Sequence, residues 1–151
     1  MPRKTTTTTL KMGVKLVNDF AKLPQKASND AACYDIVLPD DVYIAPHATK
    51  MVGTGLAFNI PQGYRVDVFL RSSIAAKTMV RLANSVGKID CDYTGEVKLL
   101  LENTGGVPAR FYRGERVAQF EINKVTDVDL EQVDDVKVTE RGAGGIGSTG
   151  I

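Results

Sequence analysis

Short runs of alternating or β-branched residues, each ended by proline or glycine, constrain the fold of this chain most. They cover residues 14–17, 34–38, 42–45, 50–60, 64–70, 96–102 and 116–124. Such runs are typical of β-strands. Turn-forming residues lie between them at 39–41, 61–63, 103–106 and 112–114. The pattern predicts an all-β barrel or sandwich.

One stretch, residues 72–81, favours a helix instead. Either Ser72 or Ser73 would cap its N-terminus, because a hydroxyl oxygen can accept a hydrogen bond from a free backbone N–H of the first turn. The stretch is too short to form a helix alone, since nucleating the first turn is unfavourable. We therefore expect it to pack on the sheet.

The chain of 151 residues fits a single domain. Residues 1–10 include five consecutive threonines and little to bury, which predicts a disordered leader. Residues 11–140 would form the β-barrel domain. Residues 141–151 would form a flexible, glycine-rich C-terminal arm.

Charge and composition exclude several classes of function. The formal net charge is +1, so no global field favours nucleic acid or an anionic membrane. No apolar run has the roughly 18 residues that a membrane span needs, and we expect a cytoplasmic protein. Cys33 and Cys91 lack zinc-site spacing, so reduced thiols are expected. His47, the single histidine, is interpreted as a solvated surface residue.

The segment 141–150 combines glycines with the donors Arg141, Ser148 and Thr149. Glycine lets bare backbone N–H groups approach an anion, and guanidinium and hydroxyl groups suit phosphate oxygens. The residues alone are compatible with two readings: a mobile arm that orders over a polyphosphate, or a frayed terminus.

The segment 87–96 carries Asp90, Asp92 and Tyr93 between glycines. Residues i and i+2 of a strand share a face, so the two carboxylates would crowd each other unless a turn separates them. A turn opened by Asp92 and closed by Gly95 would aim Asp90 and Tyr93 at a common pocket. The alternative is a plain hairpin turn.

Three further segments carry polar groups suited to an anion. Residues 70–77 place Arg71 and two hydroxyls at the expected helix N-terminus, residues 114–119 end in the amide of Gln119, and residues 31–35 end in Asp35. Taken singly, they could be a capped helix, an exposed charged turn and an Asp-capped turn.

In this order and spacing, the five segments resemble the signature motifs of the homotrimeric deoxyuridine triphosphatases (dUTPases), over about residues 22–150. The resemblance implies a jelly-roll-like β-barrel assembled as a homotrimer, with each active site shared among three subunits. It also implies hydrolysis of dUTP to dUMP and pyrophosphate, which limits uracil incorporation into DNA and supplies dUMP for thymidylate synthesis. No nucleic-acid or membrane partner is implied.

The resemblance assigns roles to individual residues. Asp90 would activate the water that attacks the α-phosphate, Arg141 would stabilise charge in the transition state, and Asp35 would contact Mg²⁺ through water. Tyr93 would lie under the deoxyribose and exclude a 2′-hydroxyl, while backbone groups of residues 84–89 would read the uracil. The substrate-binding residues implied are Arg71, Ser72, Ser73, Asn84, Gly87, Lys88, Ile89, Tyr93, Lys98, Gln119, Ile146, Gly147, Ser148 and Thr149.

Three residues depart from the family pattern. Ile146 stands where the family usually has an aromatic residue that stacks on the uracil, so weaker closure of the arm is expected. Cys33 replaces a glycine and brings the local backbone angles into question. Leu70 replaces a proline before the phosphate segment.

Other functions are compatible with parts of this pattern. The deoxycytidine triphosphate deaminases share the trimeric barrel and an Arg-Ser-Ser segment, but the arrangement of residues 89–93 is that of the pyrophosphatases. A nucleotide-dependent regulatory protein is a second alternative. A third alternative is a structural protein without a ligand, in which the presence of all these polar segments would be a coincidence.

Overall fold

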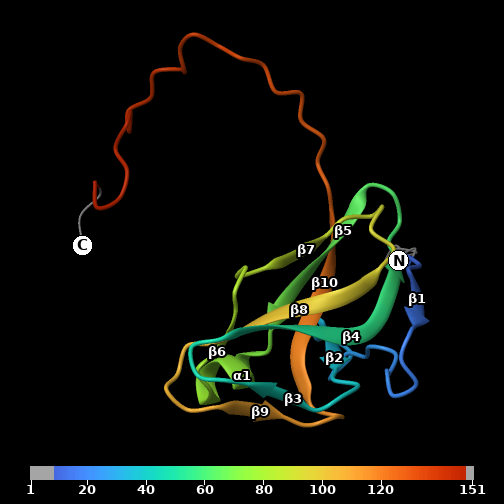
Figure 1. Ribbon diagram of the computed structural model, residues 1–151. Helices are drawn as coiled ribbons and strands as arrows, with labels where there is room; N and C mark the ends of the chain where they lie inside the picture. Colours follow the sequence, from blue (N-terminus) through green and yellow to red (C-terminus); the bar gives the residue numbers. More distant parts are fainter. Residues whose placement is uncertain (1–8, 149–151) are drawn as a thin grey trace, which may run out of the picture.

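Ten strands and one short helix make up the part of the chain that the computed structural model describes, residues 9–148 (Figure 1). The elements in chain order are β1 (Gly13–Leu16), β2 (Tyr34–Val37), β3 (Val42–Ile44), β4 (Thr49–Asn59), β5 (Tyr64–Leu70), α1 (Ser72–Lys77), β6 (Val80–Leu82), β7 (Gly87–Ile89), β8 (Glu96–Asn103), β9 (Ala109–Phe111) and β10 (Arg116–Lys124).

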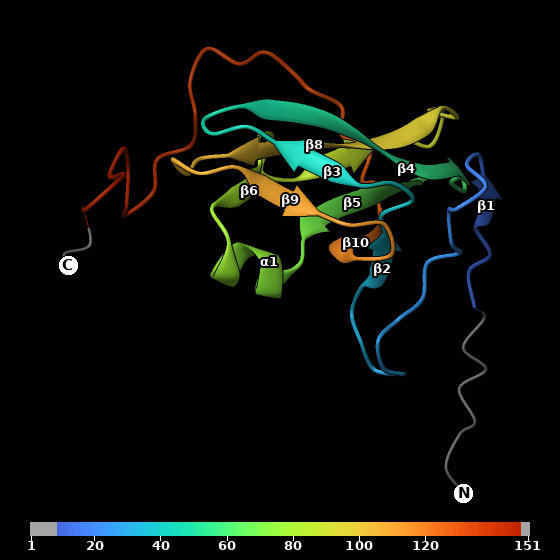
Figure 2. The ribbon, with the colours of Figure 1, turned by 60° about the horizontal axis from the view of Figure 1, so that its bottom comes forward.

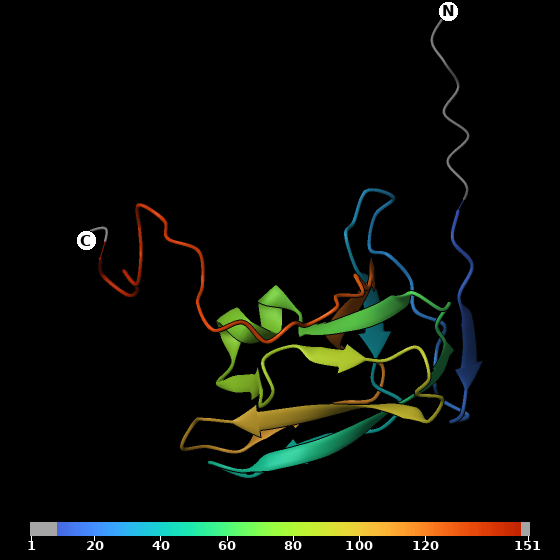
Figure 3. The same cartoon turned by 90° about the horizontal axis from the view of Figure 1, so that it is seen from above.

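The strands form two four-stranded sheets and one two-stranded sheet. One sheet has the order β1-β4-β8-β6, the second has the order β2-β10-β5-β7, and β3 pairs with β9. The pairs between these strands are antiparallel. Figure 3 shows the two larger sheets as separate layers. This architecture confirms the predicted all-β fold with one short helix.

The core lies between the two four-stranded sheets. Along β8, Val97, Leu99 and Leu101 are buried whereas Lys98 between them is exposed, so one face of the strand points inward. From the opposite layers, the rings of Phe58 and Phe120 approach to 5.1 Å between centroids. Burying side chains of this size contributes about 1.5–3 kcal/mol each. Because a one-residue slip would turn every buried side chain to water, this alternation also determines the register.

The seven strands predicted from the sequence all form, each within one residue of its expected ends. The pattern missed β6, β7 and β9. Each of these strands has three residues, which is too few for an alternation to be recognised.

The predicted helix was too long, and its predicted cap was wrong. α1 ends at Lys77, and Thr78 is extended, with φ −133°. The Thr78 hydroxyl donates to the carbonyl of Ile74 at 2.7 Å, which satisfies that acceptor where the helix stops. The N-cap is Arg71, with no side-chain cap bond, rather than Ser72 or Ser73. Figure 2 shows α1 beside the ends of β5 and β6.

After β10 the chain leaves the sheets. Residues 125–148 contain no strand or helix, and almost all of their side chains are exposed. Figure 1 shows this segment curving away from the end of β10. The expected leader, apart from residues 9 and 10, and Thr149 of the expected arm lie outside the described residues. Within the described part, no helix is long and apolar enough to cross a membrane.

Candidate active site

A buried carboxylate, Asp35, organises one end of the second sheet. Its side chain is on β2 and only 6% of the residue is exposed. Oδ1 lies 3.1 Å from Nε of Arg71, and Oδ2 lies 3.0 Å from Nη1 of Arg116. A buried carboxylate needs such partners, because it has lost its hydration. The pairing holds two guanidinium groups side by side.

The order of the strands brings these groups together. β10 lies between β2 and β5, so Gln119 on β10 is opposite Asp35 on one side and opposite Phe69 on the other. Arg71 directly follows β5, and its backbone N–H donates to the carbonyl of Val117 at 3.0 Å. Three strands far apart in sequence thus place a carboxylate, two guanidinium groups and an amide at one sheet end.

Ser72 and Ser73 extend this cluster, because they are the first two residues of α1 and directly follow Arg71. The structure therefore brings together the predicted residues Arg71, Ser72, Ser73, Gln119 and Asp35. The guanidinium, hydroxyl and amide groups among them can donate several hydrogen bonds to an anion, whereas the Asp35 carboxylate only accepts.

The sequence analysis missed Arg116, which pairs with Asp35 across 81 positions of the chain. The available signal was its place within the segment 114–119, three residues before Gln119. A cavity of about 600 Å³ adjoins Asp35 and Arg116, and Lys22 and Lys26 also line it. Its three basic side chains make this side of the cluster suited to anions.

Asp90 and Tyr93 lie in a segment that crosses from one sheet to the other. β7 pairs with β5 in the second sheet, whereas β8 pairs with β4 and β6 in the first. Residues 90–95 are therefore not a hairpin turn. The turn runs from Asp90 to Tyr93, because the Tyr93 N–H donates to the Asp90 carbonyl at 3.1 Å; the predicted turn from Asp92 to Gly95 was wrong.

The Tyr93 ring is held by a hydrogen bond at its hydroxyl end. Its hydroxyl donates to the carbonyl of Glu96 at 2.8 Å, and 44% of the residue is exposed. A Cβ on Gly95 would lie 2.8 Å from the tyrosine hydroxyl oxygen, so the ring needs a glycine there. Asp90 is exposed beside this ring in the chain. The segment thus presents a free carboxylate and a fixed aromatic face.

Asp90 lies far from the Asp35 cluster within one chain. Ile89, the residue before it, is opposite Val66 near the start of β5, whereas Arg71 follows the end of β5. Five residues of extended strand span about 17 Å, and β7 runs antiparallel to β5, away from Arg71. A single chain therefore separates its candidate base from its guanidinium cluster.

The segment 84–89 offers backbone groups more than side chains. Ser85 has a positive φ of 61°, and the Val86 N–H donates a hydrogen bond to the carbonyl of Asn84. Gly87 and Ile89 form the ends of β7. The ammonium group of Lys88 lies 2.8 Å from a carboxylate oxygen of Asp67. Its side chain is therefore engaged with the outer face of the sheet.

The remaining predicted residues are not assembled with either group. Lys98 is exposed on β8 and lies opposite Gly53 of β4 in the first sheet, away from the Asp35 cluster of the second sheet. Nε of Arg141 donates to the carbonyl of Gly144 at 2.8 Å, within the C-terminal segment itself. Ile146, Gly147 and Ser148 are exposed, and Figure 1 shows their segment away from both sheets. Thr149 lies outside the described residues.

The two departures in the folded part cause no backbone strain. Among the described residues, Cys33 is not one of those with a positive φ, so a side chain is accepted where the family pattern has glycine. Burial, followed by the carboxylates of Glu121 and Asp35, raises the pKa of the Cys33 thiol, which disfavours the reactive thiolate. Leu70 ends β5 opposite Ala118 and packs against the core.

The Asp35 cluster is compatible with a divalent metal ion that takes its remaining ligands from phosphate oxygens and water. No group of three or more His, Cys, Asp or Glu side chains suited to a metal occurs in residues 9–148. Mg²⁺ is commonly held by one or two carboxylates plus phosphate oxygens and water. Each oxygen of Asp35 has one guanidinium partner, and a carboxylate has about four acceptor sites. A contact through water is therefore compatible with this donor set.

Comparisons with known proteins identify the family to which the chain belongs. The dUTPase family profile matches residues 19–150. The deoxyuridine 5′-triphosphate nucleotidohydrolase of Nautilia profundicola is 40% identical over 141 residues, 93% of this chain and 99% of that protein. The one of Zymomonas mobilis is 41% identical over 144 residues, 94% of this chain and 99% of that protein.

A solved structure is also similar. The dUTPase of Staphylococcus bacteriophage 80alpha, with dUPNHPP, has a TM-score of 0.87 and 27% identity, and the match covers 95% of this chain and all of that one. The family profile spans all five polar segments noted in the sequence and every strand except β1. The chain belongs to the dUTPase family.

Proposed function

We propose that this protein hydrolyses dUTP to dUMP and pyrophosphate with the help of Mg²⁺, and so keeps uracil out of DNA and supplies dUMP for thymidylate synthesis. The family match supports this activity, as do the names of the relatives at 40% and 41% identity. The observation that carries the proposal is the ion-paired cluster of Asp35, Arg71 and Arg116 beside Gln119. Its guanidinium groups and the neighbouring amide are suited to binding a polyanion.

Phosphate binding follows from this cluster. Arg71, the hydroxyls of Ser72 and Ser73, and the amide of Gln119 would donate to the phosphate chain. Because Asp35 holds Arg71 in place before substrate arrives, less side-chain entropy is lost on binding. Mg²⁺, when bound to the phosphates, would reduce their negative charge. Asp35 would face that ion through water.

The chemical step needs a base near the α-phosphate. Asp90 would accept a proton from a water molecule within one hydrogen bond of its carboxylate, as that water attacks the phosphorus. Tyr93 would lie against the deoxyribose, where its fixed ring leaves no room for a 2′-hydroxyl. Backbone groups of residues 84–89 would read the uracil.

The distance within one chain implies that sites are shared. Asp90 and Arg71 lie at opposite ends of β5, which spans about 17 Å between Val66 and Arg71. One chain cannot place both on neighbouring phosphates. We therefore propose a homotrimer in which Asp90 comes from one subunit, the Arg71 cluster from another, and the C-terminal arm with Arg141 from the third.

Pyrophosphate release from dUTP, dTTP, dCTP and UTP, with and without Mg²⁺, tests the activity. We expect strong preference for dUTP and dependence on the metal. Release of ammonia from dCTP, without pyrophosphate, would instead support the deaminase alternative and refute the proposal.

The metal role of Asp35 can be separated from its role in holding arginines. Asp35→Asn should raise the Mg²⁺ concentration needed for half-maximal rate, because the charge facing the ion is lost. Arg116→Met, which removes one partner of the same carboxylate, should leave that Mg²⁺ concentration unchanged. Equal shifts in both variants would show that Asp35 acts only through the arginines.

Mixing two inactive variants tests the sharing of sites. Asp90→Asn and Arg71→Ala should each be nearly inactive alone. In trimers refolded together from equal amounts, random assembly would place an intact Arg71 beside an intact Asp90 of another subunit in about one quarter of the sites. Recovery of about that fraction of wild-type activity is expected. No recovery in verified mixed trimers would overturn the shared site.

A further inference from the structure

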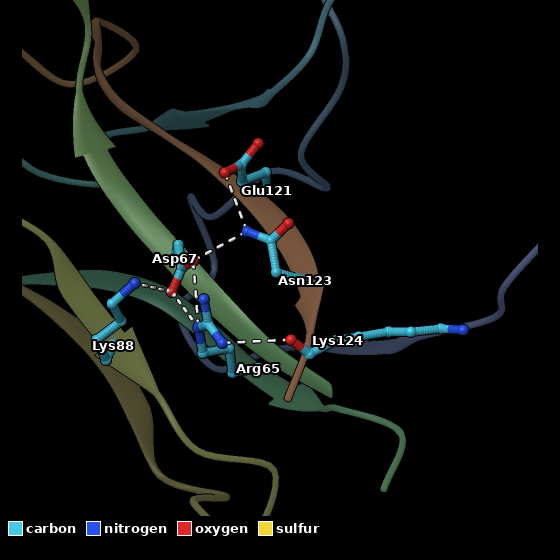
Figure 4. Close-up of polar contacts among 6 residues, drawn as sticks. All are labelled: Arg65, Asp67, Lys88, Glu121, Asn123 and Lys124. Atoms are coloured by element: carbon cyan, nitrogen blue, oxygen red, sulfur yellow. Dashed lines mark hydrogen bonds and ion pairs between the residues drawn. The ribbon is translucent and has the colours of Figure 1, made fainter. Parts of the chain in front are cut away.

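A second buried carboxylate, Asp67, lies in the middle of β5 and is not used by the proposed chemistry (Figure 4). It is 3% exposed. Its oxygens lie 3.0 Å from Nε of Arg65, 2.8 Å from Nζ of Lys88 and 2.9 Å from Nδ2 of Asn123. These partners come from β5, β7 and β10.

The carboxylate sits on the outer face of the second sheet. Its neighbours Val66 and Val68 belong to the core, so Asp67 between them points to the opposite face. Figure 4 shows the side chains of Lys88, Arg65 and Asn123 converging on it from both sides. A buried charge is tolerated only with such partners.

Lys88 differs from Arg65 and Asn123 because it connects Asp67 to a strand with few pairs, β7. Arg65 is on the same strand as Asp67. Asn123 is on β10, which pairs with β5 over seven positions, whereas β7 pairs with β5 over only three. β7 is also the edge strand of its sheet. β7 is thus held to β5 by fewer strand pairs than β10 is. The Lys88–Asp67 ion pair therefore contributes relatively more to fixing β7 than the Asn123–Asp67 hydrogen bond contributes to fixing β10.

β7 connects two parts of the proposed site. The turn at Asn84 and Ser85 leads into it, and Asp90 follows directly after it. We propose that Asp67 is a positioning residue that, through Lys88, holds β7 in place so that the segment 84–89 selects uracil. This inference rests on the proposed dUTP hydrolysis and goes beyond it by assigning base selectivity to an ion pair on the opposite face of the strand.

Three variants test the proposal. Lys88→Met removes the ammonium group but keeps the chain length, Lys88→Arg keeps the charge, and Arg65→Met is the matched control, because it removes a partner of the same carboxylate without touching β7. The first readout is the ratio of kcat/KM for dUTP to that for dTTP. The second is amide hydrogen exchange of residues 84–90, which needs no activity.

Lys88→Met should lower the dUTP to dTTP ratio by about tenfold, since a small displacement of a binding group is costly in rate, and should speed exchange of residues 84–90. Lys88→Arg should restore both values. Arg65→Met should leave the ratio unchanged, even where it lowers thermal stability. A uniform loss of rate with both substrates, equal in the two Met variants, would mean a merely structural ion pair.

The two proposals fail in different ways. If wild-type protein does not hydrolyse dUTP, the proposed function falls, and with it the role in selecting uracil. If wild-type protein is active but exchange of residues 84–90 in Lys88→Met is no faster than in Arg65→Met, the positioning role of Asp67 is overturned and the proposed function stands.

Discussion

Tyr93 shows how single contacts prepare the proposed sugar-binding surface. Its hydroxyl donates to the Glu96 carbonyl, and the absence of a side chain at Gly95 leaves room for the ring in this position. Rejecting an additional hydroxyl by fit alone is weak in an adaptable apolar pocket. A ring fixed in this way is a steric wall, which is the stronger device.

We predict that Tyr93→Ala raises the ratio of kcat/KM for UTP to that for dUTP by about tenfold or more, because the wall against the 2′-hydroxyl is gone. Tyr93→Phe keeps the ring and loses only the hydrogen bond to Glu96, so it should change that ratio far less. Steady-state kinetics with both nucleotides measure the effect. An unchanged ratio in Tyr93→Ala would place the sugar elsewhere.

Ile146 is fully exposed in the C-terminal segment. An isoleucine can cover the uracil but has no aromatic face to stack on it, and aromatic pairs contribute about 0.5–1.5 kcal/mol beyond area burial. We predict that Ile146→Phe lowers KM for dUTP several-fold. Equal KM values for the variant and the wild-type protein would show that this position does not contact the base.

At the scale of elements, local chemistry explains both the success and the errors of the sequence reading. The long strands are rich in alternating or β-branched residues and are bounded by turn residues, and they were found within one residue of their ends. The predicted helix was longer than α1 because the apolar pattern of the sequence continues beyond Lys77. In the structure the helix ends there, since the Thr78 backbone is extended and the Thr78 hydroxyl donates to the Ile74 carbonyl. β7 was missed because three residues carry no period.

The network that joins β7, β5 and β10 makes stability depend on acid pH. Burial alone would raise the pKa of Asp67, but the hydrogen bonds from Lys88, Arg65 and Asn123 outweigh it and hold that pKa below its ordinary value of 3.8. A lowered folded-state pKa stabilises the fold above the unfolded pKa. This contribution is lost as pH falls through the folded pKa.

We predict that Asp67→Asn lowers the free energy of unfolding by about 2 kcal/mol near neutral pH, since hydrogen bonds to a charged group are lost. The difference from wild type should persist down to about pH 5 and shrink below pH 3.8. Urea unfolding at fixed protein concentration measures it, because assembly shifts apparent stability. A difference that stays constant from pH 6 to pH 3 would contradict the assignment.

Considering the whole molecule, residues 125–148 of the C-terminal segment contribute no buried side chain to the core of their own chain. Residues 125–148 lie outside the sheets, and most of their side chains are exposed. This geometry fits an arm that completes a site elsewhere. The sequence reading left open whether such a tail is an arm or a frayed end, because glycine favours both.

We predict that truncation after Glu140 lowers kcat/KM for dUTP by at least about 100-fold, since Arg141 and the closing arm are removed. The melting temperature should change little, because the described part of the removed segment lies away from the sheets. Calorimetry and pyrophosphate release check the two halves of this prediction. Full activity in a folded truncated protein would remove the arm from the mechanism.

The fold class, the position of the long strands and the polar segments typical of the family could all be predicted from the amino-acid sequence. These properties depend on local alternation, on turn residues and on motif order, all of which are written along the chain. The sequence also identified Asp35, Arg71 and Gln119 as members of one site, through the resemblance rather than through any computed proximity.

Which of these groups lie close together could be seen only in the folded chain. It paired Asp35 with Arg116, 81 positions away, it placed Lys88 on Asp67, and it put Asp90 at the far end of β5 from Arg71. The physical reason is that strand order and register bring these residues together. A sheet order follows from the packing of all strands at once, and no local pattern encodes it.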